Sequence, residues 1–279
     1  MREPLSVAPQ NVVAPLIRSS AVHLLLMVVG FAALDLLLNL PNLVQVPPWA
    51  WLVVYALFFP VAHAVGRLTG AGGLGAMGLA VHRGWGRNLL LGFVLCGAVW
   101  ALKYGLLWGL GAFRVEAPRS AGAITVLVLQ SLGVMFLSSA TDDLLVRGYL
   151  FRQLSRYLSA GALVALTTAV YVLNHAWYVH LSLETCVYLG LLGVTFALAL
   201  ARTGSLWLSI GVHWGGNVVY RLYDGFDGQG GLFSLVKSPG ATWQEWVSTG
   251  AAVVALAALF VLFRFTVKSE REGPLTVHG

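Results

Sequence analysis

The sequence predicts an all-α membrane protein, a single bundle of about eight transmembrane helices. Of its 279 residues, 58% are hydrophobic and only 10% are charged, whereas ordinary soluble domains carry about 25% charged residues. Apolar segments of about 20 residues recur from one end of the chain to the other, and a helix of that length crosses a bilayer core of about 30 Å. These two observations exclude a soluble domain and favour one membrane domain over residues 1–279.

Eight apolar segments account for the predicted bundle. They cover residues 17–40, 48–67, 88–111, 121–140, 160–179, 184–201, 205–222 and 247–265. The first follows a long polar leader without a small-residue cleavage site, so we expect a retained anchor instead of a removed signal peptide. No internal repeat is evident, which argues against a transporter built from duplicated halves.

The basic residues predict the orientation of the bundle. They are spread over short loops and form no stripe, which argues against nucleic acid as a partner despite the net charge of +6. With both termini in the cytoplasm, 12 of the 17 basic residues lie on the inner side and 5 on the other, as the positive-inside rule requires. The inner set is Arg2, Arg18, Arg67, Arg83, Arg87, Arg147, Arg152, Arg156, Arg202, Arg264, Lys268 and Arg271, and the outer set is Lys103, Arg114, Arg119, Arg221 and Lys237. We therefore expect an integral protein of a bacterial inner (plasma) membrane with an even number of spans.

The segment between the second and third spans is rich in glycine and includes Trp85 and Arg83. Because tryptophan and arginine favour the headgroup level, residues 70–87 are expected to form an interfacial connector, with a plain loop as the alternative. Cys96 and Cys186 each lie inside an apolar segment, which excludes a disulfide framework and a cysteine-based zinc site.

The first polar cluster, Asp142, Asp143 and Arg147, follows the fourth span. Ionisable groups at membrane depth cost at least about 2.5 to 3.5 kcal/mol unless they find a partner or water, so each calls for an explanation. On a helix Asp143 and Arg147 are four residues apart and share a face, whereas Asp142 points about 100° away. We expect Arg147 to neutralise Asp143 and Asp142 to project elsewhere, although a purely structural ion pair is the competing interpretation.

Two further clusters lie in the fifth and seventh spans. Tyr171 and His175 share a face at a spacing of four residues, with Asn174 beside them, and His213 and Asn217 have the same spacing. One carboxylate, two imidazoles and one carboxamide are sufficient for water activation, because the carboxylate takes a proton and the carboxamide donates to an oxyanion. A lone intramembrane histidine is more often a hydrogen-bonded packing residue, but three such clusters in one bundle favour a site.

The order of these clusters resembles the CPBP family, the CAAX protease and bacteriocin-processing (Abi) membrane proteins that include the Ras-converting type of CAAX prenyl endopeptidase. That family shows Glu-Glu-x-x-x-Arg, then Phe-x-x-x-His, then His-x-x-x-Asn or Asp, on separate helices of an eight-helix bundle. The corresponding segments here are Asp142-Asp143-Leu-Leu-Val-Arg147, Tyr171-Val-Leu-Asn-His175 and His213-Trp-Gly-Gly-Asn217. The resemblance covers about residues 121–220, the expected motif core.

The resemblance implies an intramembrane peptidase, a hydrolase that acts on a membrane-associated or lipid-modified protein and has membrane lipid as a further partner. It places Asp142 at the position of the water-activating glutamate and His175 beside the same water. It gives His213 and Asn217 the oxyanion-stabilising role, with Asp143, Arg147 and Tyr171 in support.

The sequence departs from the family pattern in ways that put this activity in question. Aspartate replaces both glutamates and Tyr171 replaces phenylalanine, and the shorter Asp142 carboxylate is withdrawn by about 1 to 1.5 Å, where a 1 Å misplacement can cost about 100-fold in rate. A catalytically weakened or inactive protein acting in bacteriocin immunity or as a membrane scaffold is therefore the first alternative. A small-solute or proton transporter is the second.

The same residues offer a possible site for a metal cofactor. Asp142, His175 and His213 can supply three ligands to a catalytic zinc or similar divalent metal, but no His-Glu-x-x-His helix is present. We favour a mechanism without an obligatory metal.

Overall fold

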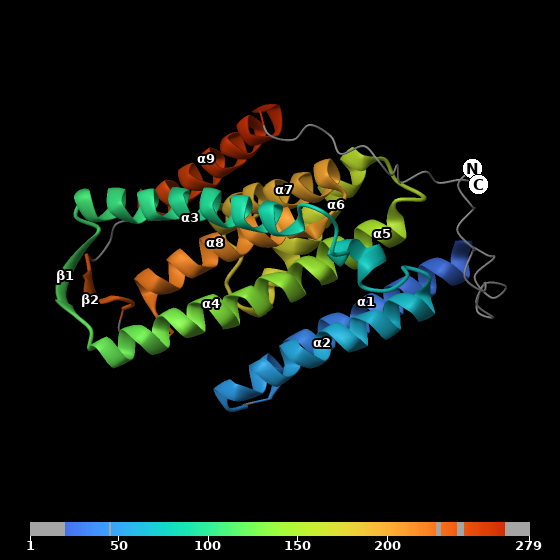
Figure 1. The fold of residues 1–279 in the computed structure, drawn as a ribbon, viewed down its shortest axis with the longest axis horizontal. Coiled ribbons are helices and arrows are strands. Elements are labelled where there is room, and N and C mark those ends of the chain that lie inside the picture. Colours follow the sequence, from blue (N-terminus) through green and yellow to red (C-terminus); the bar gives the residue numbers. More distant parts are fainter. Residues whose placement is uncertain (1–19, 45, 227–229, 239–242, 266–279) are drawn as a thin grey trace.

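The computed structural model describes residues 20–44, 46–226, 230–238 and 243–265, and most of these residues are helical (Figure 1). The elements are, in order, α1 (Ser20–Leu43), α2 (Pro48–Thr69), η1 (Gly75–Leu79), α3 (Trp85–Gly109), β1 (Phe113–Pro118), α4 (Ala121–Asp143), η2 (Leu144–Tyr149), α5 (Leu150–Leu154), α6 (Ala160–Asn174), η3 (His175–Trp177), α7 (Leu183–Thr203), α8 (Leu206–Asp224), β2 (Phe233–Lys237) and α9 (Trp243–Phe265). Within these ranges, seven helical stretches are long and apolar enough to span a membrane. The predicted polytopic all-α membrane bundle is confirmed.

Helix α8 occupies the position of the predicted span at 205–222 but is not one of the seven apolar stretches. Its 19 residues include His213, Asn217, Arg221 and Asp224, which lower its hydropathy. It packs mainly against α3, α4 and α7, and most of its first thirteen residues are buried. The least apolar long helix therefore lies inside the bundle, where protein and not lipid surrounds its polar side chains.

Glycines allow α3 and α8 to approach closely. A Cβ atom on Gly211 would lie 2.2 Å from the carbonyl oxygen of Leu89, and one on Gly215 would lie 2.2 Å from that of Phe93. Small residues permit such backbone contact between membrane helices, where lipid provides no hydrophobic drive for association. These glycines have a packing role, and they fix the depth at which α8 presents its polar face.

Helix α4 continues without a break into η2 and α5, so that residues 121–154 form one helical stretch. Residues 144–149 have the wider π-helical turn, directly after Asp142 and Asp143. Gly148 lies in this turn, and a Cβ there would approach the carbonyl oxygen of Met77 to 2.7 Å. Such turns occur frequently at functional sites, and this one brings the polar end of α4 against the connector.

The connector between α2 and α3 is an ordered segment, not a plain loop. Its η1 turn buries Met77, and the Trp85 ring packs on Trp207 with centroids 4.8 Å apart. The Trp207 indole N–H donates to the carbonyl oxygen of Ala80 at 2.9 Å. The connector is thus fixed to the start of α8.

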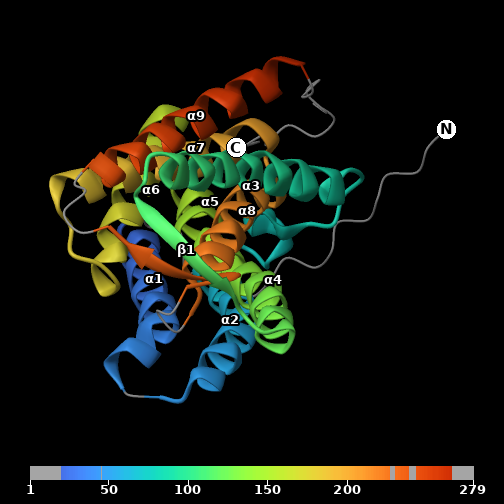
Figure 2. The ribbon, with the colours of Figure 1, turned by 90° about the vertical axis from the view of Figure 1, so that its left-hand side faces the viewer.

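A two-stranded antiparallel sheet closes the opposite end of the bundle and was not predicted (Figure 2). Strand β1 pairs with β2 from Phe113 opposite Lys237 to Pro118 opposite Phe233. The strands are five and six residues long and more than a hundred residues apart in sequence, so no local pattern indicates their pairing. We call the end of the bundle that holds the paired strands β1 and β2 the hairpin end, although the strands are distant in sequence. The end with η1 and α5 is the connector end.

The alternating helix directions divide the basic residues between the two ends. Among the described residues, those in loops or helix ends at the connector end are Arg67, Arg83, Arg87, Arg152, Arg156, Arg202 and Arg264, and those at the hairpin end are Arg114, Arg119 and Lys237. Four further basic residues of the predicted inner set, Arg2, Arg18, Lys268 and Arg271, lie outside the described residues.

Candidate active site

A buried ion pair lies at the centre of the bundle. Arg147 donates to the Asp143 carboxylate, one helical turn away, and neither side chain is accessible to solvent. The Ser209 hydroxyl donates to the other carboxylate oxygen at 2.9 Å. The guanidinium carbon lies 4.5 Å from the ring centroid of Tyr171 and 4.8 Å from that of Phe196, so two aromatic rings cover the cation. The predicted pairing of Asp143 with Arg147 forms, and it joins α4 to α8 through Ser209.

Asp142 points away from this pair. It is partly accessible and lines a large cavity, and within the described part of the chain it makes no hydrogen bond or ion pair. The 100° rotation between consecutive helical residues separates the two carboxylates, as the spacing predicted. One acid is neutralised inside the protein, and its neighbour keeps a free carboxylate at the cavity wall.

His175 begins η3 at the end of α6, and its orientation is fixed. Its Nδ1 lies 2.8 Å from the backbone carbonyl oxygen of Tyr171, and its ring meets the Tyr171 ring edge-on at 4.4 Å. Since a carbonyl oxygen can only accept, Nδ1 carries the hydrogen. In the neutral ring Nε2 is then left with a lone pair as an acceptor. Asn174, the neighbour in the predicted cluster, is buried and is not among the residues that line the cavity.

His213 and Asn217 reach the cavity from α8. The His213 ring stacks on Phe196 with centroids 4.6 Å apart, and its Nδ1 lies 3.7 Å from the nearer Asp143 oxygen. The Asn217 amide donates to the hydroxyl of Ser139 at 3.1 Å, which orients the carboxamide and leaves its second N–H for another acceptor.

The sequence interpretation missed Ser139 and Ser209. Ser139 precedes Asp143 by four residues, and Ser209 precedes His213 by four, so both continue a helical face that was already identified. The spacing was a usable signal. Serine side chains in membrane helices commonly hydrogen-bond to the backbone of their own helix, however. Only the contacts with Asn217 and Asp143 distinguish Ser139 and Ser209 from such serines.

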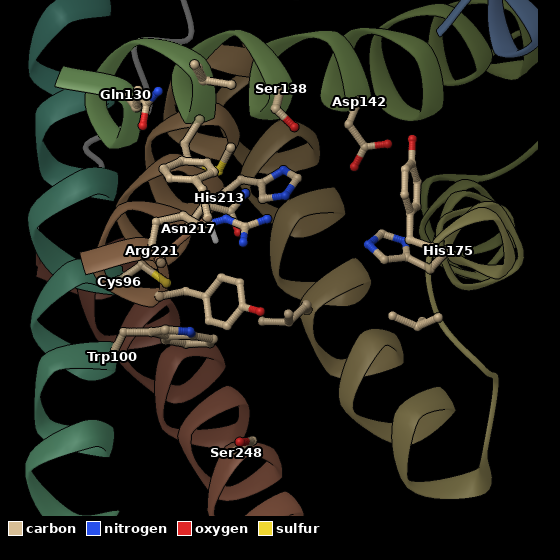
Figure 3. A pocket seen from close by; sticks show the side chains of 18 of the residues that line it. Cys96, Trp100, Gln130, Ser138, Asp142, His175, His213, Asn217, Arg221 and Ser248 are labelled. Carbon is tan, nitrogen blue, oxygen red and sulfur yellow. The ribbon is translucent and has the colours of Figure 1, made fainter. Parts of the chain in front are cut away.

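One cavity of about 1540 Å³ brings the predicted side chains together (Figure 3). Figure 3 shows Asp142 and His175 on one side and His213 and Asn217 on the other, all directed toward the same space. The cavity extends to the hairpin end, where its wall includes the residues Trp49, Arg119, Glu184 and Glu245, each at or next to the start of a helix. The polar groups from α4, η3 and α8 therefore share one chamber, which is large enough for several residues of an extended peptide.

The candidate metal ligands do not fit a metal ion as the side chains stand. Among the described residues, no three or more His, Cys, Asp or Glu side chains lie close enough together to hold one. Asp142, His175 and His213 line the same cavity without converging on a point that could hold a metal ion.

Residues 124–219 match the family model described as Type II CAAX prenyl endopeptidase Rce1-like. This segment is similar to the Rce1-like type II CAAX prenyl endopeptidases. The matched segment contains all three polar motifs and nearly all of the 121–220 segment that carried the predicted resemblance, which it confirms. No curated protein and no solved structure shows significant similarity to the chain. The seven apolar helices and this family match together indicate an integral membrane protein and support a function of the CAAX protease kind.

Proposed function

We propose that this protein is an intramembrane endopeptidase that hydrolyses a peptide bond of a membrane-associated or lipid-modified protein. The observation that carries the proposal is the shared cavity: Asp142, His175 and the α8 pair, from three segments of the Rce1-like core, line one chamber inside an apolar bundle. Ionisable side chains at membrane depth are costly and mark a functional site by default.

The chemistry follows from the hydrogen-bonding capacity of each group. A water molecule between Asp142 and His175 donates one hydrogen to the carboxylate and one to Nε2, so that its lone pair is directed at the substrate carbonyl carbon. The water oxygen bonds to that carbon, and Asp142 accepts the proton that the water loses. When the carbon–nitrogen bond breaks, Asp142 returns the proton to the leaving amine. Asn217 and His213 donate hydrogen bonds to the oxyanion that develops meanwhile.

The proposal is tested by turnover of membrane peptides in proteoliposomes. We expect wild-type protein to cleave at least one peptide of a panel with apolar membrane segments, and His175→Ala to lower kcat/KM about 100-fold or more, since a positioned acid–base group contributes roughly 10² to 10⁴. His180→Ala is the matched control, because His180 is exposed and outside the cavity. Equal turnover by all three proteins would refute the role of His175.

A non-catalytic function is the alternative, and it is favoured by the presence of Asp142 and Asp143 where the family pattern has glutamates. An immunity or scaffold protein of the same fold needs the partner surface and not the cavity acid, so it retains its cellular effect when Asp142 is alanine. Loss of both turnover and the cellular effect in Asp142→Ala excludes this alternative.

We further propose that both termini are cytoplasmic and that the cavity opens on the opposite, extracytoplasmic side. The connector end has seven of the described basic loop residues and the hairpin end has three, which the positive-inside rule assigns to the cytoplasm and the exterior. The substrate segment then enters from the exterior or the outer leaflet.

Cysteine labelling in intact bacterial cells tests this orientation. With Cys96 and Cys186 replaced by alanine, a membrane-impermeant maleimide should label Glu116→Cys in β1 and not Arg156→Cys between α5 and α6. Both positions are exposed in the structure, and both should react after permeabilisation. Labelling of Arg156→Cys alone in intact cells would mean that the orientation is the reverse of the proposed one.

A further inference from the structure

A chain of polar side chains on α1, outside the three motifs, reaches the segment that carries His175. Asp35 and Asn39 are four residues apart on α1, and Asn39 is fully buried. The Asn39 amide donates to the carboxylate of Asp35 and to its backbone carbonyl oxygen, each at 3.0 Å. The Asn39 oxygen accepts from the hydroxyl of Tyr178 at 2.6 Å and from the amide of Asn42 at 3.2 Å. The proposed mechanism uses neither Asp35 nor Asn39.

The orientation of Asn39 fixes the direction of its bond to Tyr178. A backbone carbonyl oxygen can only accept, so the nitrogen of the Asn39 side chain faces Asp35. The Asn39 oxygen then faces Tyr178, whose hydroxyl donates. With two hydrogen bonds given and two accepted, the carboxamide uses its full capacity. Asn39 is therefore a fixed acceptor at the side of α1.

Tyr178 ends the short turn that begins at His175. Their rings meet edge-on with centroids 6.2 Å apart, and both side chains line the cavity. Trp177 is 40% exposed and Tyr178 is 50% exposed, so packing alone holds this turn weakly. The Trp177 side chain also interacts with the Asp35 carboxylate. The polar groups of α1 therefore hold the turn from a second helix.

The hold from α1 complements the one within α6. The carbonyl oxygen of Tyr171 fixes the His175 ring relative to α6, but it belongs to the last turn of the same helix and moves with that helix end. Asp142 comes from α4, and a water shared with His175 requires a fixed distance between two separate helices. A displacement of 1 Å can cost about 100-fold in rate.

We propose that Asp35, Asn39 and Tyr178 form a positioning chain that fixes His175 relative to Asp142. The Tyr178 hydroxyl is engaged with Asn39, so the chain acts on the reaction through the turn that carries His175. The effect on turnover rests on the proposed peptidase function, whereas the hold on the turn can be measured without turnover.

Kinetics and hydrogen exchange of the full-length protein in proteoliposomes test this chain. The kinetic assay gives kcat and KM for a membrane peptide that wild type cleaves. The exchange experiment follows the backbone amides of Tyr178 and Val179, which donate to the carbonyl oxygen of His175 at 2.9 and 3.0 Å. The variants are Tyr178→Phe, Asn39→Leu and the double change, because leucine keeps the shape of asparagine without its polar atoms.

Tyr157→Phe is the matched control. The Tyr157 hydroxyl forms a hydrogen bond of similar length, 2.9 Å, with the buried His23, but Tyr157 does not line the cavity. This variant should keep the wild-type kcat and the wild-type exchange of the two amides.

We expect Tyr178→Phe to lower kcat about 5- to 100-fold, with KM within about twofold of wild type, and to speed exchange of the two amides by a similar factor. A buried acceptor that loses its donor implies an effect of this size. The double variant should lose no more than Asn39→Leu alone, because both changes remove the same hydrogen bond and their effects are not additive.

Three results would overturn the positioning chain. They are a wild-type kcat in Tyr178→Phe, a rise in KM at unchanged kcat, which would make Tyr178 a substrate contact, and additive losses in the double variant. Faster exchange in Tyr178→Phe and Asn39→Leu, in a protein that cleaves no peptide, supports the hold on the turn and refutes the peptidase instead.

Discussion

Replacement of Arg147 by methionine is expected to destabilise the protein by about 3 to 5 kcal/mol. The change leaves the Asp143 carboxylate fully buried with the Ser209 hydroxyl as its remaining hydrogen-bond donor. Removal of one partner of a buried ion pair costs this much because the other charge stays uncompensated in a medium of low dielectric constant. It also removes the cation that lies against the rings of Tyr171 and Phe196.

Thermal and denaturant unfolding in detergent measure this effect, with two reference variants. Arg152→Met is the matched control, because Arg152 is exposed one turn beyond the pair, and it should unfold like wild type. The double change Asp143→Leu with Arg147→Met removes both charges and should recover most of the stability. If Arg147→Met alone is as stable as wild type, the pair does not hold α4 against α8 as we describe.

The second large effect concerns the reach of the Asp142 carboxylate. Asp142→Glu moves the carboxylate forward by about 1 to 1.5 Å, and we expect kcat/KM to fall about 100-fold, because a 1 Å displacement near reacting atoms costs that much. The partner acceptor cannot follow, since His175 is held by the backbone carbonyl of Tyr171. A site built for aspartate therefore loses rate on lengthening, whereas a gain in rate for Asp142→Glu would mean that this cavity is a decayed glutamate site.

Tyr171 replaces the phenylalanine of the family pattern without changing the contacts that position 171 makes with His175 and Arg147. The group that orients His175 is the backbone carbonyl of residue 171, which phenylalanine supplies equally well. The aromatic face that covers Arg147 is likewise common to both residues. Neither observed contact depends on the tyrosine hydroxyl.

The positions of the helices, and the helix faces on which their polar residues lie, were predictable because both depend on local chain geometry. A long helix forms at each of the eight predicted segments, and seven of these helices are apolar enough to span a membrane. The spacing of four residues paired Asp143 with Arg147 and aligned His213 with Asn217. The sequence alone did not show that α8 is interior and not lipid-facing. That depends on Gly211 and Gly215 meeting α3, a contact between segments more than a hundred residues apart.

Other parts of the site depend on contacts between distant segments in the same way. The hydrogen bond that Asn217 donates to Ser139 joins residues 78 positions apart, and the cavity exists only because five or more helices leave space between them. Lys103 and Arg221 also line this cavity although they lie 118 positions apart, and nothing in their sequence neighbourhoods predicts that they share it.

The turnover of Asp142→Asn in proteoliposomes tests the central claim most directly. Asparagine keeps the shape of the side chain and removes its basicity, so the measurement isolates the proton acceptor. Water activation by Asp142 predicts that kcat falls roughly 10²- to 10⁴-fold while unfolding in detergent stays as in wild type. Cleavage of the same peptide at the wild-type rate by a folded Asp142→Asn protein would contradict it.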